Sequence, residues 1–198
     1  MWEQLKGSVG PQVWELFLCP MATRLSEHIG GKNVMGGKGA SGSRFTAWWD
    51  SYAKWETTAG SYGINTAIET VGGCPNESWW PAAPNPKSAF WFDPVDGAAC
   101  ASIPVMVDCL AFRTWGEDKW GAPPYEDAYP AVWCGTCINR HDGGVNCVFL
   151  DWSVRKVGLK ELWTLKWHKQ FNTAGIWTKA GGVQPEDWPA WMRRFKDY

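Results

Sequence analysis

Tryptophan is the feature that most constrains how this chain can fold, because it accounts for 17 of the 198 residues. The tryptophans are spread along the chain, with doublets at Trp48-Trp49 and Trp79-Trp80. An indole is costly to bury because its N–H group needs a hydrogen-bond partner. We therefore expect some of these rings at the surface, where aromatic faces stack on sugars or contact protein partners. The alternative is a core and a set of loops that are simply rich in tryptophan.

The overall composition narrows the class of protein. The length fits one globular domain, residues 1–198, that can bury a core. The net charge is −1, with 19 basic and 20 acidic residues, so a basic face for nucleic acid is not indicated. The 22 glycines and 13 prolines favour a loop-rich α+β or mostly β domain. No apolar run approaches the roughly 20 residues of a membrane helix, so we expect a soluble chain without a membrane span.

Strand-like runs lie in the middle of the chain. Residues 103–112 are apolar apart from Asp108 and predict a buried strand. Residues 132–140 and 145–156 predict two further strands, joined around Asp142-Gly143-Gly144. An Asp-Gly pair between strand-like runs is a strong hairpin signal.

Helical spacing of apolar residues occurs in three places. The first run begins at Pro20 and ends before Gly30-Gly31, which are typical helix-ending residues. The other two lie in the tryptophan-rich tail, residues 159–198, where one runs from Leu159 to Trp167 and the other follows Pro189. We expect short helices in all three, and so a helical tail.

Two long loops are rich in aromatic residues and proline. They cover residues 74–94 and 113–130, and loops of that length often carry function. Their candidate ligand-binding residues, for a glycan or a protein partner, are Trp79, Trp80, Trp91, Trp115 and Trp120.

Carboxylates lie beside these tryptophans, and Glu117 with Asp118 is the best candidate pair for acid and base. Glycoside hydrolysis needs two carboxylates about 5–9 Å apart beside a sugar platform. The alternative is a pair of solvated loop carboxylates. The sequence has neither a nucleophile elbow nor the spacing of a phosphate-binding loop, so no cofactor is predicted.

The seven cysteines cannot all pair within one chain. We expect at least one disulfide, either Cys74–Cys100 or Cys100–Cys109, because closing a long loop stabilises most in the loop-entropy model. A zinc set of Cys134, Cys137, His141 and Cys147 is the alternative. We favour the disulfide, expect no metal, and expect Cys147 to pack as a small apolar residue.

One segment carries a resemblance to a known family. His141 and Asp151 are separated by nine residues, with Gly143-Gly144 after the histidine. This resembles the prepilin-type domain defined by His, nine residues, then Asp-Gly. Trp152 stands where the family has glycine, so we expect that turn to differ, because tryptophan does not readily take a positive φ.

Three further segments agree with the family in order along the chain: Cys19-Pro20, residues 61–65 and the strand at 103–108. The resemblance implies an α+β, pilin-like antiparallel sheet with short helices and long aromatic loops. It also implies a hairpin at 139–157, with His141, Asn146 and Asp151 as structural residues that close it through bonds to the backbone. Family members begin with a long hydrophobic helix, which we expect this chain to lack.

The resemblance implies a non-enzymatic, pseudopilin-like domain that is extracellular, periplasmic or at the cell surface. Its aromatic loops would contact partners, and it could self-associate as a homo-oligomer. The alternative from the residues themselves is a carbohydrate-binding protein or a small glycoside hydrolase.

Overall fold

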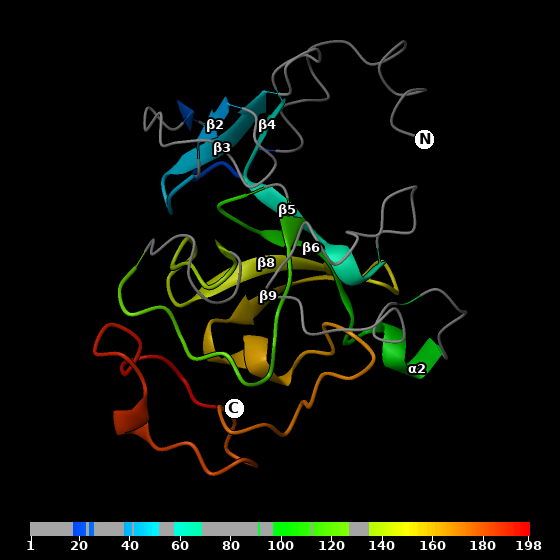
Figure 1. Cartoon of the computed structure of the whole chain (residues 1–198), viewed down its shortest axis with the longest axis vertical. Coiled ribbons are helices and arrows are strands. Elements are labelled where there is room, and N and C mark those ends of the chain that lie inside the picture. The colour runs from blue at the N-terminus through cyan, green and yellow to red at the C-terminus, as the bar shows by residue number, and fades with distance from the viewer. Residues whose placement is uncertain are drawn as a thin grey trace.

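In the computed structural model, two β-sheets and a few short helices make up a sheet-rich domain (Figure 1). The smaller sheet lies above the larger one in Figure 1, and the C-terminal tail lies below it. The structure describes residues 18–22, 24–25, 38–40, 42–51, 58–68, 91, 97–111, 113–126 and 135–198.

The larger sheet has 5 strands in the order β7-β5-β6-β8-β9. Neighbouring strands are antiparallel except for β5 and β7, which are parallel. Its strands are β5 (Tyr62–Asn65), β6 (Pro104–Asp108), β7 (Arg113–Thr114), β8 (Gly144–Phe149) and β9 (Val154–Gly158). The strand predicted within residues 103–112 is therefore confirmed as β6.

The smaller sheet is built around one strand, β3 (Thr46–Ser51). It pairs in parallel with β1 (Arg24–Leu25) and antiparallel with β2 (Lys38–Ala40) and β4 (Thr58–Gly60). Helical structure is sparse in the part of the chain described: α2 (Gly97–Cys100) and the 3-10 helices Thr66–Ile68, Lys160–Thr164 and Pro185–Asp187. None of these helices has the length and apolar character needed to cross a membrane.

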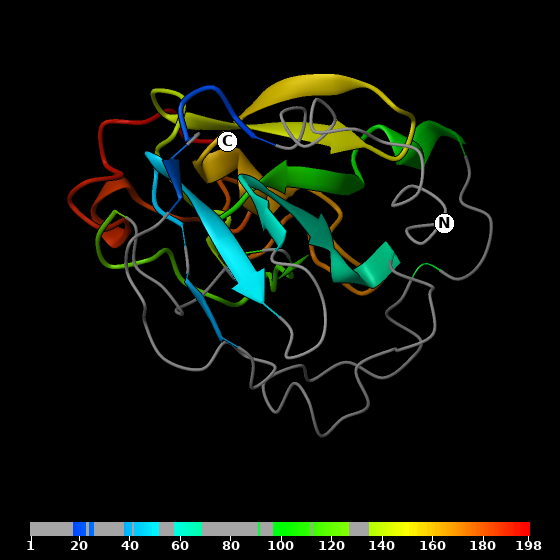
Figure 2. The ribbon, with the colours of Figure 1, turned by 90° about the horizontal axis from the view of Figure 1, so that it is seen from above.

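The β-hairpin lies one strand later than the Asp-Gly signal predicted, and it overlaps the hairpin that the resemblance implied at 139–157. Residues 135–140 form no strand, and the predicted second strand, 145–156, is divided between β8 and β9. These two strands form the hairpin and run along one edge of the sheet (Figure 2). Asp142 and Gly143 do make a tight turn, with φ values of 46° and 80°. That turn leads the chain into β8 instead of joining two strands.

The turn of the β8–β9 hairpin contains Trp152, which has a φ of 66°. The expectation that tryptophan would change this turn is therefore wrong. The residue takes the conformation that glycine would take, at a steric cost that Cβ imposes. Its ring is 79% exposed, so packing against the described residues does little to offset that cost.

The predicted helices are also corrected. Arg24 and Leu25 form β1, inside the first predicted helix. The second is reduced to the 3-10 helix Lys160–Thr164, and the third is a series of turns closed by bonds such as Met192 N–H to Pro189 O, 2.8 Å. Three glycines and two prolines fall within residues 175–189, and both residue types disfavour a continuous helix there.

The tail nevertheless buries the side chains that the spacing singled out. Leu162, Trp163 and Trp167 pack in one core with Phe149 of β8 and with Trp188. Two of the tail indoles donate to backbone carbonyls, Trp163 Nε1 to Trp120 O and Trp167 Nε1 to Leu162 O, both at 2.8 Å, whereas the buried Nε1 atoms of Trp177 and Trp188 have no hydrogen-bond partner among the described residues. The tryptophans of the tail therefore serve chiefly as core, which is the alternative that the sequence left open.

Candidate functional site

A buried ion pair lies between the two sheets. Arg140 Nη1 is 3.1 Å from Asp108 Oδ1, and neither side chain is exposed. Arg140 also donates to the backbone carbonyls of Ser61, at 2.6 Å, and Ser43, at 2.7 Å. The guanidinium therefore joins the end of β6 to the chain before β3 and before β5.

The sheet register places Asn146 beside the same carboxylate. Val107 of β6 is paired with Cys147 of β8, so the next residue of β6, Asp108, lies level with Asn146. The backbone N–H of Asn146 donates to Asp108 Oδ2 at 2.6 Å. Both oxygens of this buried carboxylate therefore accept hydrogen bonds.

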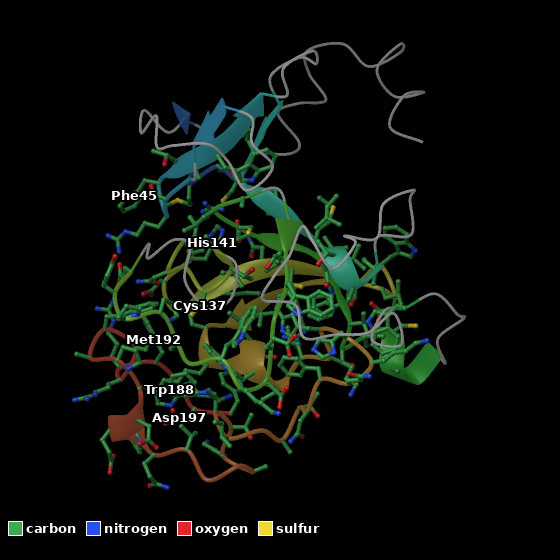
Figure 3. The ribbon with its side chains drawn as sticks, in the orientation of Figure 1. Phe45, Cys137, His141, Trp188, Met192 and Asp197 are labelled. Atoms are coloured by element: carbon green, nitrogen blue, oxygen red, sulfur yellow. The ribbon has the colours of Figure 1, made fainter. Side chains whose placement is uncertain are left out.

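His141 completes the cluster. Its Nε2 atom is 3.1 Å from Asp108 Oδ2, 3.2 Å from Cys19 Sγ and 3.0 Å from Asn146 Nδ2. Figure 3 shows His141 between the smaller sheet and β8, at the boundary where these elements meet. We refer to Cys19, Asp108, Arg140, His141 and Asn146 as the Asp108 cluster.

Cys19 reaches the cluster from a short N-terminal segment, residues 18–22. A turn closed by Ala22 N–H and Cys19 O, 2.8 Å, positions the thiol, and Ser61 Oγ fixes the segment by donating to Ala22 O at 2.8 Å. Burial raises the pKa of the Cys19 thiol, and burial beside Asp108 raises the pKa of Tyr62 to about 12. Both groups are therefore neutral at pH 7.

The geometry does not fit a cysteine nucleophile. In a catalytic triad the histidine contacts the nucleophile with one ring nitrogen and the carboxylate with the other. Here Cys19 and Asp108 both face Nε2 of His141, and Cys19 is fully buried. The thiol is thus protonated and closed off from a substrate.

The carboxylate of the candidate acid, Glu117, already contacts two side chains of the fold. Its Oε1 accepts a 2.6 Å hydrogen bond from Trp115 Nε1, and its Oε2 is 3.4 Å from His168 Nε2. The His168 ring stacks on Trp115, with centroids 5.0 Å apart. Glu117 is only 7% exposed, while its neighbour Asp118 is half-buried. This arrangement gives Glu117 a structural part.

Three of the predicted aromatic platform residues do come together. Trp91 and Trp120 are half-buried and pack against Trp115, which is 3% exposed. Because Trp115 faces inward, its ring is not available to stack on a ligand. Trp79 and Trp80 lie outside the described residues.

The residues that carry the family resemblance are placed at the two ends of β8. His141 and Asn146 meet at its start, whereas Asp151 follows its end. Asp151 Oδ1 accepts bonds from the backbone N–H of Ser153, at 2.9 Å, and from its hydroxyl, at 2.6 Å. Asp151 therefore closes a turn through the backbone as predicted, while His141 contacts side chains instead. The spacing of nine residues spans one strand and its flanking turns.

The cysteine predictions are partly overturned. The described cysteines form no disulfide with one another, so the Cys100–Cys109 bond is wrong. Cys74, the other candidate partner of Cys100, lies outside the described residues. Cys147 is 1% exposed and packs in the core as predicted.

The zinc set proposed at residues 134–147 does not converge where the structure describes it. Cys137 lies in the core, with its Sγ 3.9 Å from Met192 Sδ, whereas His141 belongs to the Asp108 cluster (Figure 3). Cys134 lies outside the described residues.

Sequence reasoning missed Cys19, Asp108 and Arg140 as members of one site. A signal was present for Asp108, because a carboxylate that ends a buried strand needs a buried partner. Cys19 and Asp108 also belong to segments that carry the family resemblance. What the sequence does not contain is the pairing of β6 with β8, which brings these segments together.

No protein-family model matches this chain, and no curated protein or solved structure shows significant similarity to it.

Proposed function

We propose that this chain is a pseudopilin-like globular domain, with an assembly or binding role outside the cytoplasm and no catalytic reaction. The observation that carries the proposal is the meeting of the four segments that resemble the family. They are the segments around Cys19, residues 61–65, residues 103–108 and residues 139–155.

Buried polar bonds join these segments. Cys19 contacts His141, and the Ser61 carbonyl accepts from Arg140. Asn65 Nδ2 donates to Pro104 O and to Trp167 O, each at 2.9 Å. A satisfied buried network of this kind fixes one arrangement of a core. The resemblance is thus supported by residues that share one structural task.

The sheet gives a second line of support. A pilin-like domain is built on an antiparallel sheet with one face covered by a long helix. In this chain β5, β6, β8 and β9 are successive antiparallel neighbours, and side chains of the C-terminal tail pack against β8. Packing of the tail against this sheet supports the proposal, because a pilin-like sheet needs one face covered.

Partner contact is best supported at the hairpin turn. Trp152 is 79% exposed, and Val154 beside it is 68% exposed. These two side chains form an apolar tip that a second copy, another pilin-like subunit or a glycan can contact. The engaged carboxylate of Glu117, in contrast, supports no role in glycan hydrolysis.

Subcellular fractionation of the source cells tests the proposal, using an antibody against the folded chain. We expect the protein in the periplasmic, surface or secreted fraction, and cross-linked into oligomers or to pilin-like subunits. Recovery of a cytoplasmic monomer would overturn it. Turnover of any substrate in a screen of chromogenic glycosides would overturn the non-enzymatic part, and retention on a polysaccharide would instead identify the partner class.

A further inference from the structure

Three different metal-binding groups converge in the Asp108 cluster. The sulfur of Cys19, a carboxylate oxygen of Asp108 and the imidazole nitrogen of His141 all lie within 4.8 Å of one another. Two ligand atoms on a tetrahedral zinc ion are about 3.3–3.6 Å apart, given the usual bond lengths. The corresponding distances from His141 Nε2 are 3.2 Å to sulfur and 3.1 Å to oxygen. An outward shift of His141 Nε2 by a few tenths of an ångström would bring these two distances to the values of a zinc site.

His141 Nε2 has more polar neighbours than one hydrogen bond can serve. A neutral imidazole nitrogen has either one hydrogen or one lone pair. Three polar atoms, from Cys19, Asp108 and Asn146, nevertheless lie 3.0–3.2 Å from it. One hydrogen or lone pair cannot serve all three well, whereas an ion at their centre satisfies several at once.

Asn146 supplies a fourth ligand. The oxygen and nitrogen of a side-chain amide are distinguished only by their hydrogen bonds, so the group can be turned over in place. Turning it brings Oδ1 to the position of Nδ2, 3.0 Å from His141 Nε2. The set then consists of one sulfur, one nitrogen and two oxygens, which is enough for a tetrahedral ion.

The carboxylate ligand is held by groups that would not touch the ion. Arg140 Nη1 binds Asp108 Oδ1, and the backbone N–H of Asn146 binds Oδ2. Partners of this kind orient the ligands of protein metal sites and contribute to their affinity. Because Asp108 and Cys19 are fully buried, water competes little for their donor atoms.

We propose that Cys19, Asp108, His141 and Asn146 form a binding site for a divalent transition-metal ion, of which zinc is the best fit. A thiolate with an imidazole selects zinc or cobalt over magnesium and calcium, which prefer oxygen ligands. Cys19 binds as the thiolate and releases its proton to solvent, and His141 binds through the Nε2 lone pair. The ion would fasten residues 18–22 to β6 and β8. This inference does not depend on the proposed pseudopilin role.

Cobalt and zinc titrations of the whole chain test the site. The protein is stripped with a chelator under reducing conditions, and Co²⁺ is then added. We expect one equivalent to give the intense d–d bands and the thiolate charge-transfer band of a tetrahedral cobalt–thiolate site, with Zn²⁺ displacing it. At a hundredfold excess over its Kd, zinc should raise the melting temperature by about 5–10 °C. Absence of both effects overturns the proposal.

Two variants assign the ligands. Cys19→Ser should abolish the charge-transfer band, whereas Cys100→Ser, at a half-buried cysteine outside the cluster, should keep it. A band that survives Cys19→Ser unchanged would overturn the proposal by placing the ion elsewhere.

Asn146→Asp tests the site through an increase in zinc affinity, which a variant that failed to fold would not show. Without metal it should lower the melting temperature, because a second carboxylate then faces Asp108. With zinc it should bind about tenfold more tightly than the wild-type chain, because an anionic oxygen replaces the amide. A variant whose zinc affinity is unchanged or weaker would contradict the role of Asn146 as a ligand.

Discussion

Arg140 is the residue on which the two sheets most depend. Its side chain is unexposed, pairs with Asp108 and donates to backbone carbonyls before β3 and β5. A buried ion pair is weak evidence of net stability, since desolvating both charges offsets their attraction. Removing one partner is strongly destabilising, because the other charge then stays buried without an opposite charge beside it.

Arg140→Met should therefore lower the free energy of unfolding by about 3–5 kcal/mol. Methionine keeps the length of the side chain but leaves Asp108 and the Ser43 and Ser61 carbonyls without the guanidinium. Urea denaturation followed by tryptophan fluorescence measures the change. Arg194→Met is the matched control, because the Arg194 side chain is 65% exposed and its ion pair with Glu126 is long, at 3.7 Å. This variant should change the free energy of unfolding by less than about 1 kcal/mol. Equal effects of the two variants would contradict the role given to Arg140.

The β8–β9 hairpin is held by side-chain contacts at the start of β8, and its backbone is strained at the turn. His141 and Asn146 contact Asp108 and so connect its first strand to β6, whereas its turn holds Trp152 at positive φ. Asp151 supports the turn through Ser153. Trp152 thus disfavours the backbone conformation that the hairpin turn adopts, and substitution of this residue can measure the cost in stability.

Trp152→Gly should stabilise the protein by about 0.5–1 kcal/mol. Glycine relieves a penalty of about 1–2 kcal/mol for a left-handed residue and gives back part of it through greater freedom in the unfolded chain. Trp152→Ala separates this effect from loss of the exposed ring, because alanine keeps the Cβ and should give no gain. Thermal melts of the two variants decide. If alanine stabilises as much as glycine, backbone strain is not the cause.

The hairpin turn should also respond to acid. Hydrogen bonds from the Ser153 hydroxyl and N–H lower the pKa of the Asp151 carboxyl. Its contribution to stability is thus present above the carboxyl pKa of the unfolded chain and is lost as pH falls through the folded-state pKa. In Asp151→Asn this titration is absent, so the stability difference from the wild type should shrink as the solution is acidified below about pH 4. A difference that stays constant with pH would argue against an ionised Asp151 in the turn.

At the scale of the whole molecule, the C-terminal tail completes the core of the larger sheet. Trp163 and Trp188 pack edge to face, with ring centroids 5.1 Å apart, and Lys160 is buried with its Nζ 2.6 Å from Asp197 Oδ1. In Figure 3 Trp188, Met192 and Asp197 lie below Cys137, on the side away from the smaller sheet. The tail is therefore part of the core and not an appendage to it.

Cysteine labelling can report whether the tail opens separately. Burial raises the pKa of Cys137 and of Cys147, so neither forms a reactive thiolate in the folded protein. Under iodoacetamide with mass-spectrometric readout, both should react only at the rate of global unfolding, while half-buried Cys100 reacts earlier. If Cys137, which contacts Met192, reacts well before Cys147, the tail detaches on its own.

The sequence by itself determined the features that depend on near neighbours. It predicted a sheet-rich domain, the buried strand that includes Val107, the inward position of Cys147 and the Asp151 turn. The first three follow from composition, from apolar runs and from alternation, which act within a few residues, whereas the Asp151 turn was implied by the family resemblance. The Asp-Gly signal misplaced the hairpin, and helical spacing misplaced the helices because the tail packs through tertiary contacts that override it.

Only the tertiary structure decided the candidate site. Cys19, Asp108 and His141 are far apart in sequence, and they meet because β6 pairs with β8 and because residues 18–22 are fastened beside β5. The inward placement of Trp115 was decided in the same way, by the core that it joins. Which strands pair and which side chains become buried together depend on contacts between residues far apart in the chain, and patterns among near neighbours do not specify them.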